Sequence, residues 1–232
     1  MRSIFKTSLI ACATVIAASS AFAQKAGDNI YSIGLASINP DVSLGKITST
    51  SPTFQGALTN ATANVGSKTA VSLSWLRMFD DNLGAEFTIG VPAEFSQDLT
   101  TPATSSTHLA AAKMKIWTPA AVGKYFFGTT NDKWRPYVGF GVSRVSFHNV
   151  EINRNDSTVL AMAGTSAAFS SSWVPVYNAG AIYNIDDKWS INGSVSYLPI
   201  KTTATFVGSG AVTTGDAKLN TTDYVIRLGY RF

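Results

Sequence analysis

The sequence predicts an all-β protein, an eight-stranded antiparallel transmembrane β-barrel. Three observations lead to this fold class: apolar residues recur at every second position, short and long connections alternate, and the chain ends on an amphipathic strand. Hydrophobic residues make up 45% of the 232 residues, but after residue 23 no segment approaches the roughly 18 consecutive apolar residues of a spanning helix. Such a chain forms a soluble β-domain or a membrane barrel, and the character of the polar face distinguishes the two.

The first 23 residues have the features of a secretory signal peptide. Arg2 and Lys6 supply the positive region, an apolar run follows at residues 8–18, and Ala21-Phe22-Ala23 offers a small-x-small cleavage site. We therefore expect residues 1–23 to be removed. The barrel domain is then residues 24–232.

An alternative interpretation uses Cys12, because Leu9-Ile10-Ala11-Cys12 fits a bacterial lipoprotein box. Only about five uncharged residues separate Lys6 from Cys12, fewer than the roughly 7–15 of an apolar signal region. This favours cleavage after Ala23. A chain cut there contains no cysteine, which excludes disulfides, thiolate catalysis and cysteine-ligated metals although a periplasm is oxidising.

Period-two alternation defines the strands. In the last strand, aromatic and aliphatic residues share one face while Arg, Gly and Asp occupy the other. In the other strands the polar face is mostly Gly, Ser, Asn and Thr with few charges, which suits a narrow, filled lumen behind a lipid-facing band. The predicted strands are residues 28–40, 67–79, 83–95, 109–127, 135–148, 173–185, 189–206 and 216–232.

Connection lengths predict the orientation, because outer-membrane barrels have short periplasmic turns and long outer loops. The predicted short turns are residues 80–82, 128–134 and 186–188. The predicted outer loops are residues 41–66, 96–108, 149–172 and 207–215. Two irregular features are also expected: a bulge or kink at Thr118-Pro119, since proline cannot donate to a ladder, and a short helix within the alanine-rich residues 158–169.

The aromatic residues predict where the membrane lies. They gather near the short-turn ends, as an interfacial girdle does, and comprise Trp75, Phe79, Tyr125, Phe127, Tyr183, Trp189, Tyr230 and Phe232. The terminal Tyr230-Arg231-Phe232 is typical of the signal by which the barrel assembly machinery recognises its substrates. We therefore expect export through the periplasm to a Gram-negative outer membrane.

The charges are few and nearly balanced. Signal cleavage removes Arg2 and Lys6 from the 18 basic residues, so 16 remain against 14 acidic ones, and no basic block exceeds two residues. Nucleic acid is therefore not expected as a partner. Buried charges need partners, so the inward charges are predicted to form a network in the lower lumen: Glu86, Lys124, Asp223, Arg227 and Arg231. Outer-membrane lipids are expected partners, and Arg144 near the outer rim could pair with lipopolysaccharide phosphates.

Several motifs, in order, resemble the outer membrane protein W (OmpW) family along residues 27–232. They are Arg135-Pro136-Tyr137-Val138-Gly139-Phe140-Gly141-Val142, Trp173 followed by Ala179-Gly180, Ile185-Asp186-Asp187-Lys188-Trp189-Ser190, Tyr197-Leu198-Pro199-Ile200-Lys201-Thr202-Thr203, and Gly229-Tyr230-Arg231-Phe232. The resemblance implies an eight-stranded barrel with a narrow hydrophobic channel for small hydrophobic solutes, alkanes in one branch. It equally leaves open a channel for small amino acids, or a structural or phage and bacteriocin receptor barrel without transport.

The resemblance also implies site residues. Pro92 corresponds to a family proline associated with a lateral gate, and the missing donor of a proline is suited to a gap in the ladder. Trp173 corresponds to a tryptophan at the channel mouth.

Apolar residues in the predicted outer loops either pack together or line a vestibule, and those assigned to ligand contact are Phe54, Leu58, Leu99 and Phe169.

Catalysis is not expected. His108 and His148 lie at the outer ends of predicted strands with hydroxyls nearby, but no motif supplies a base, a nucleophile and an orienting group together. The two histidines could at most bind a metal weakly. We therefore expect a non-enzymatic protein without a cofactor or a resident metal.

Overall fold

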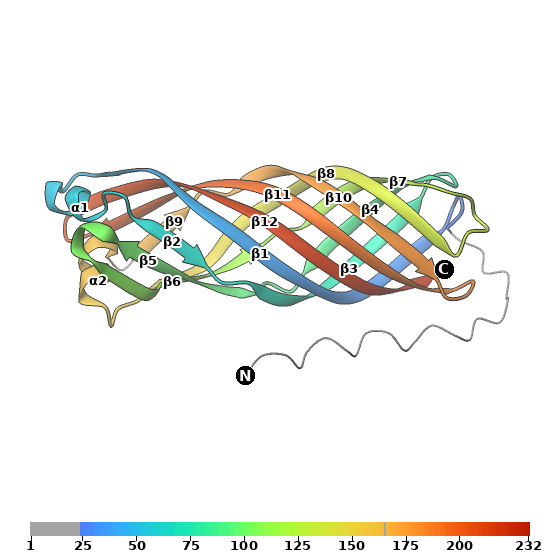
Figure 1. Ribbon diagram of the computed structural model, residues 1–232, viewed down its shortest axis with the longest axis horizontal. Coiled ribbons are helices and arrows are strands. Elements are labelled where there is room, and N and C mark those ends of the chain that lie inside the picture. Colours follow the sequence, from blue (N-terminus) through green and yellow to red (C-terminus); the bar gives the residue numbers. More distant parts are fainter. Residues whose placement is uncertain (1–23, 165) are drawn as a thin grey trace, which may run out of the picture.

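The computed structural model describes residues 24–164 and 166–232, so the predicted signal peptide at residues 1–23 lies outside the described residues. The described chain is mostly antiparallel β-structure (Figure 1). In chain order the elements are β1 (Asn29–Ser49), α1 (Pro52–Ala57), β2 (Thr62–Val65), β3 (Lys68–Met78), β4 (Leu83–Gly90), β5 (Glu94–Thr101), η1 (Pro102–Thr104), β6 (Ser106–Trp117), β7 (Ala120–Phe126), β8 (Trp134–Ile152), α2 (Ser157–Ala163), β9 (Ser166–Phe169), β10 (Ser172–Asn184), β11 (Trp189–Gly208) and β12 (Ala211–Arg231).

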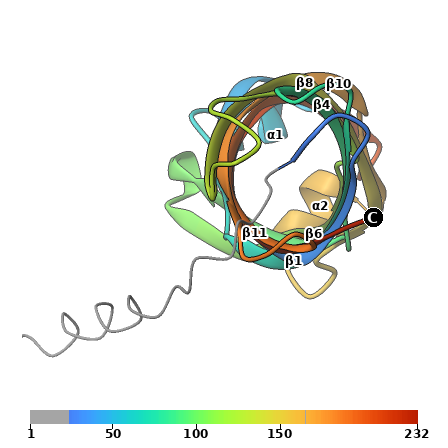
Figure 2. The same cartoon turned by 90° about the vertical axis from the view of Figure 1, so that its right-hand side faces the viewer.

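Within the described residues, eight strands close into a ring, which confirms the predicted fold class. The order around the ring is β1, β3, β4, β7, β8, β10, β11 and β12, and β12 pairs antiparallel with β1. Figure 2 shows the ring from the end that carries the C-terminus. Closure satisfies the backbone groups that an open edge would leave unpaired in hydrocarbon.

Two predicted strands, residues 83–95 and 109–127, are each divided in two. β4 ends at Gly90 and β5 begins at Glu94, while β6 ends at Trp117 and β7 begins at Ala120. Each break contains a proline, Pro92 or Pro119, which removes a ladder donor. The kink predicted at Thr118-Pro119 is confirmed. The break at Pro92 replaces the continuous strand that alternation alone predicted.

Beyond the breaks, β5 and β6 extend the wall toward the outer end. β6 pairs with the outer part of β8, β5 pairs with β6, and β2 pairs with β5. The predicted loop at residues 207–215 is wrong: β11 and β12 run on to a tight turn at Ser209-Gly210, where both φ angles are positive, 47° and 76°. Such a pair of residues is what a two-residue hairpin turn requires.

The two ends of the barrel differ as the connection lengths predicted. The short turns lie at the end that carries the C-terminus, and α1 and α2 lie at the opposite, outer end (Figure 1). Rings meet around the short-turn end: Trp189 and Tyr230 have centroids 4.9 Å apart, Tyr230 and Phe232 are 4.8 Å apart, and Phe232 and Tyr31 are 5.5 Å apart. These contacts place Trp189, Tyr230 and Phe232 together at the end where the girdle is predicted.

The outer surface of the barrel is apolar. Ile33, Phe140 and Ile226 are 56–61% exposed, although each lies within a strand of the ring. Outward apolar residues on neighbouring strands would make an unusually large apolar surface in water. A lipid environment satisfies them, as the lipid-facing band of a membrane barrel requires. Among the described residues, no helix has the length and apolar character needed to cross a membrane.

Candidate functional site

A buried ion network occupies the lower lumen, toward the short-turn end. Lys124 Nζ lies 2.6 Å from Glu86 Oε2, and Arg227 Nη1 lies 3.5 Å from Glu86 Oε1. Arg227 also donates to Ser72 Oγ from Nε and Nη2, at 3.0 and 2.8 Å. All three charged side chains are 5% exposed or less. The contacts bring together Glu86, Lys124 and Arg227, as the sequence predicted.

A second polar layer forms the floor of the barrel. Arg231 Nε pairs with Asp28 Oδ2 at 3.2 Å, so Arg231 belongs to this layer and not to the network around Glu86. Arg135, fully buried, donates at 2.6 Å to the carbonyl oxygens of Gln24 and Asp81. Arg135 was not predicted as a floor residue, although it lies directly after a short turn and shares the inward face with Tyr137.

Asp223 stands apart from both layers, contrary to its predicted place in the network. No ion pair joins it to a cation of the described residues, and its Oδ1 is buried without a hydrogen-bond partner there. The physical reason is its height in the barrel. Asp223 points inward four residues, or two periods of the alternation, above Arg227, with Val225 between them, while Arg227 is engaged by Glu86 and Ser72.

The outer half of the lumen is apolar, which corrects the prediction of a small, polar inner face. Val145, Val174, Val176, Leu198, Ile200 and Leu219 form a buried cluster there. The small polar inner face holds only for the lower half. In the outer half, alternation wrongly predicted a polar inner face, because both faces of the outer strand segments carry apolar residues. The sequence period therefore does not reveal which face is inside there.

Three cavities lie in series along this lumen. The outer cavity, about 100 Å³, is lined almost entirely by apolar side chains that include Leu44, Met114 and Leu219. The middle cavity, about 30 Å³, is lined by Leu219 and Asp223 among others. The inner cavity, about 80 Å³, is lined by Asp223, Glu86 and Arg227. Leu219 lines both the outer and the middle cavity, and the middle and inner cavities share Asp223 together with Ile38, Ile116, Thr118 and Leu198.

The short helices cover the outer cavity. α2 turns Val159 and Met162 into it, and Leu58, which ends α1, also lines it. Each helix has a side-chain cap: Ser51 Oγ accepts from the Phe54 N–H, and Asp156 Oδ1 accepts from Thr158 and Val159. The helix predicted within residues 158–169 is confirmed at Ser157–Ala163.

Most of the predicted contact residues lie at the outer cavity. Leu58, Leu99 and Phe169 line it, and Phe54 packs beside it against a cluster that includes Leu58 and Met162. Trp173 does not line it. Trp173 is 67% exposed on the outward face, with the Arg144 guanidinium 5.6 Å from its ring centroid. Its inward neighbour Val174 takes the lumen position, because successive side chains alternate across the wall.

The barrel wall is interrupted beside the inner cavity. The β4–β7 ladder ends at Thr88↔Ala120, and pairing resumes only at Glu94↔Lys115 between β5 and β6. Pro92 and Pro119 both fall in this interval. The inner cavity reaches the interruption, since Val91, Ala93 and Thr118 are among its lining residues. We refer to this interval, residues 89–93 and 116–119, as the wall break.

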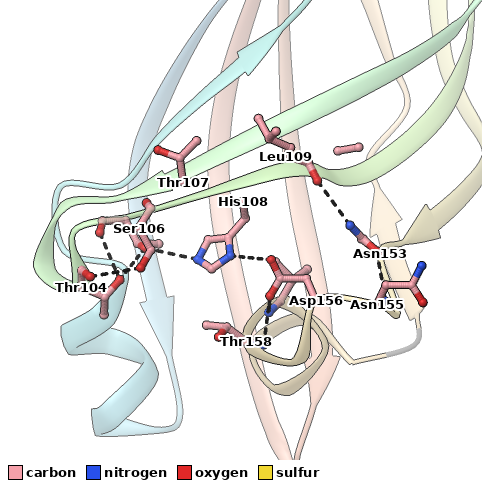
Figure 3. A network of polar contacts seen from close by, with 12 residues as sticks. Thr104, Ser106, Thr107, His108, Leu109, Asn153, Asn155, Asp156 and Thr158 are labelled. Atoms are coloured by element: carbon pink, nitrogen blue, oxygen red, sulfur yellow. Dashed lines mark hydrogen bonds and ion pairs between the residues drawn. The ribbon is translucent and has the colours of Figure 1, made fainter.

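The two histidines have separate surroundings at the outer end. His108 Nδ1 lies 2.7 Å from Asp156 Oδ2 (Figure 3). His108 Nε2 lies 3.5 Å from Thr101 Oγ1. His148 Nε2 contacts Ser146 Oγ at 3.2 Å on the exposed surface. The Thr101 side chain is buried and lies 2.6 Å from Thr104 Oγ1. The His108–Asp156 pair ties β6 to the N-terminus of α2 and so fixes the cover of the outer cavity.

The N-terminus of α2 stabilises the charged form of Asp156 in the His108–Asp156 pair. The backbone N–H of Val159 is the strongest influence that holds the pKa of Asp156 below its usual range, and the hydrogen bond from His108 adds to it. A carboxylate is favoured at a helix N-terminus by the orphan N–H groups and the helix dipole. In the described part of the chain, no group of three or more His, Cys, Asp or Glu side chains is placed to hold a metal ion.

Comparison with known proteins agrees with this architecture. The sequence profile of the OmpW family matches residues 25–232. The outer membrane protein W of Vibrio cholerae serotype O1 is 32% identical over 98% of this chain and 100% of its own length. The outer membrane protein AlkL of Ectopseudomonas oleovorans is 27% identical over 75% of this chain and 70% of its own length.

Solved structures agree as well. The outer membrane protein OprG of Pseudomonas aeruginosa superposes with a TM-score of 0.79 and 27% identity, over 90% of this chain and 98% of that one. The outer membrane protein W of E. coli gives a TM-score of 0.53 and 25% identity, over 90% and 99%. The chain is therefore a Gram-negative outer-membrane β-barrel that belongs to the OmpW family.

Proposed function

We propose that this barrel is a channel for passive uptake of small, largely apolar molecules across the outer membrane. The solute enters the outer cavity beneath α1 and α2, passes the middle and inner cavities, and leaves sideways through the wall break beside Pro92 into the bilayer. The observation that carries the proposal is the series of cavities, which begins in an apolar chamber and ends at an interruption of the ladder.

The lower lumen supports a sideways exit over an axial one. Below the inner cavity a solute would meet the buried ion pairs of Glu86 with Lys124 and Arg227, and then the floor made by Arg135. Passage would require separating charges in a poorly solvated interior, which costs several kcal/mol per unpaired ion. The wall break lies above that barrier and opens toward hydrocarbon, where an apolar solute is favoured.

We extend the proposal to the lipid and protein partners. Arg144 and Trp173 lie on neighbouring strands of the outward face, and Lys201 and Lys218 face each other on β11 and β12. Like charges directly opposite each other destabilise a sheet, and bridging lipopolysaccharide phosphates would relieve this. At the other end, Phe232 is 75% exposed beside Tyr230, as a signal read by the assembly machinery requires.

We also propose that the Thr101–His108–Asp156 arrangement is structural and not catalytic. A nucleophile must reach its substrate, whereas Thr101 is fully buried and already bonded to Thr104. An esterase assay on purified protein with phospholipid and aryl-ester substrates tests this. Turnover that is lost in His108→Ala would overturn it.

Uptake is tested in a deletion strain that expresses each variant at matched outer-membrane levels. Met162→Glu places a charge in the outer cavity and Pro92→Ala restores a ladder donor at the wall break. Both are expected to slow uptake of a labelled short alkane several-fold. The matched control is Ile226→Val, which trims a lipid-facing side chain. Equal uptake by the deletion strain and the wild type would refute transport and favour a receptor role, whereas uptake of small amino acids alone would favour an amino-acid channel.

A further inference from the structure

The inner cavity has a row of polar side chains on β10, β11 and β12, while the residues that the wall break contributes to it are mostly apolar. Asn178, Ser196 and Asp223 form one row across β10, β11 and β12, because Asn178 pairs in register with Ser196 and Ser196 with Asp223. In the ring order, β11 and β12 stand across the lumen from β4 and β7. The polar row therefore faces the wall break, whose contribution to the cavity includes Val91 and Ala93.

Two acceptor oxygens of this row have no hydrogen-bond partner among the described residues. They are Asp223 Oδ1 and Asn178 Oδ1, both buried. The Asn178 amide is oriented by its own donor, since Nδ2 gives hydrogen bonds to Ser196 Oγ at 2.9 Å and to the Val195 carbonyl at 3.1 Å. Its oxygen is thus left as an acceptor. Buried acceptors are normally satisfied in folded proteins, so this row is suited to a donor from a ligand.

The neighbouring cations do not supply that donor. Arg227 is engaged by Glu86 and Ser72, and Lys124 by Glu86. Asp223 also stands at the junction of the middle and inner cavities, because it lines both. A solute that moves from the apolar chambers to the wall break therefore passes this carboxyl group.

We propose that Asp223 and Asn178 form a head-group subsite for small amphipathic molecules, with an alkyl body and one hydrogen-bond donating end, a hydroxyl or an ammonium. This inference rests on the proposed function and deepens it by naming the substrate class. The donor end binds Asp223 while the alkyl body occupies the apolar middle and outer cavities, whose lining includes Leu198 and Leu219. A carboxylate-headed molecule would face the carboxylate of Asp223 and the acceptor oxygen of Asn178, and is disfavoured there.

The first test is binding to the purified full chain in lipid nanodiscs, followed by backbone amide shifts of Asn178 and its neighbours. The probes share one chain length: n-octane, 1-octanol, n-octylammonium and octanoate. We expect saturable amide shifts at the polar row with 1-octanol and n-octylammonium, and at least tenfold weaker binding of octanoate. Equal shifts from octane and from octanol at Asn178 would overturn the subsite.

Two variants separate the hydrogen bond from the charge. Asp223→Leu removes the acceptor and is expected to weaken both octanol and octylammonium at least tenfold, with octane unchanged or stronger. Asp223→Asn keeps an acceptor, so octanol binding is retained while octylammonium binding falls. The control is Asp216→Asn, since Asp216 lies exposed on the outward face. Octanol binding that is unchanged in a folded Asp223→Leu barrel would assign Asp223 to charge balance alone and overturn the inference.

Uptake into cells then separates this inference from the proposed function. If octane and octanol enter wild-type and deletion cells at the same rate, transport fails, and the amide shifts still decide whether the subsite exists. If uptake requires the protein but Asp223→Leu changes the uptake rates of octane and octanol equally, the proposed transport stands and the subsite is refuted. A selective loss of octanol uptake in Asp223→Leu supports both.

Discussion

Removing the Glu86 carboxylate is expected to be among the most destabilising single changes in the lumen. Glu86 is 5% exposed and is the shared partner of Lys124 and Arg227. Glu86→Gln preserves the size of the side chain but leaves two buried cations without a compensating charge. The perturbation is therefore electrostatic and not a loss of packing.

The magnitude follows from the burial of the cations. Breaking a buried ion pair by removing one partner costs about 3–5 kcal/mol. Arg227 keeps its two hydrogen bonds to Ser72, so Lys124, 1% exposed, bears most of the cost. We expect Lys124→Met to be less harmful in the Glu86→Gln background than alone, with a coupling energy of about 2 kcal/mol.

The assay is reversible urea unfolding in detergent micelles, followed by tryptophan fluorescence. With an m-value of about 2 kcal/mol/M, Glu86→Gln should lower the midpoint by roughly 2 M. The matched control is Glu94→Gln, an exposed carboxylate opposite Lys115, for which less than about 1 kcal/mol is expected. A midpoint shift for Glu86→Gln no larger than that of Glu94→Gln would refute the reasoning.

Three further predictions concern the outer cover, a strand contact and the floor. The pKa of Asp156 is depressed in the fold, so the carboxylate stabilises α2 above the ordinary carboxyl pKa, and this stabilisation is lost as the pH falls through the folded-state pKa. Hydrogen-exchange protection of α2, measured as a function of pH, should show this loss. Asp156→Ala should cost about 1 kcal/mol of stability at neutral pH. Gly141→Ala places a Cβ against the Ala121 carbonyl oxygen. The fraction of protein that runs as the heat-resistant folded band on gels should therefore decrease. Arg135→Met removes charge-assisted bonds to two carbonyl groups and should lower stability by about 3 kcal/mol, measured by urea unfolding.

Much of the barrel could be predicted because one physical constraint repeats in every strand. A lipid-facing band must alternate with a lumen face, and residues such as Tyr224, Ile226 and Leu228 follow that rule without exception. The constraint weakens toward the outer end, where the lumen is itself apolar. There Val174 and Trp173 are both hydrophobic, so the period of the sequence alone could not show which of the two faces the lumen.

The site was predicted in its parts but not in its assembly. Charged residues on the lumen face predicted a network, and three of the five predicted members, Glu86, Lys124 and Arg227, meet. The separation of Asp223 depends on height along the barrel, which follows from strand tilt and stagger and not from the order of residues. The floor contact of Arg135 depends on where residues 24–28 fold back. The position of Arg135 after a short turn indicates the floor, but the pattern does not reveal that Gln24 and Asp81 supply the carbonyl oxygens.

The wall break and the ion network support each other in the proposed route. An interruption of the ladder at the level of the outer cavity would let lipid chains enter the apolar chamber, and one at the level of the network would expose charges to hydrocarbon. The break at residues 89–93 and 116–119 instead contains no charged residue and adjoins the inner cavity through Val91, Ala93 and Thr118, although Glu86 and Arg227 line the same cavity elsewhere. Beyond the inner cavity the lumen is closed by the ion pairs of Glu86, so the bilayer is the next apolar phase that a solute can enter. Pro92→Ala restores the ladder donor and should therefore slow exit of the solute from the barrel more than its entry. Labelled alkane bound to the barrel should then increase before the rate of uptake into the cell decreases.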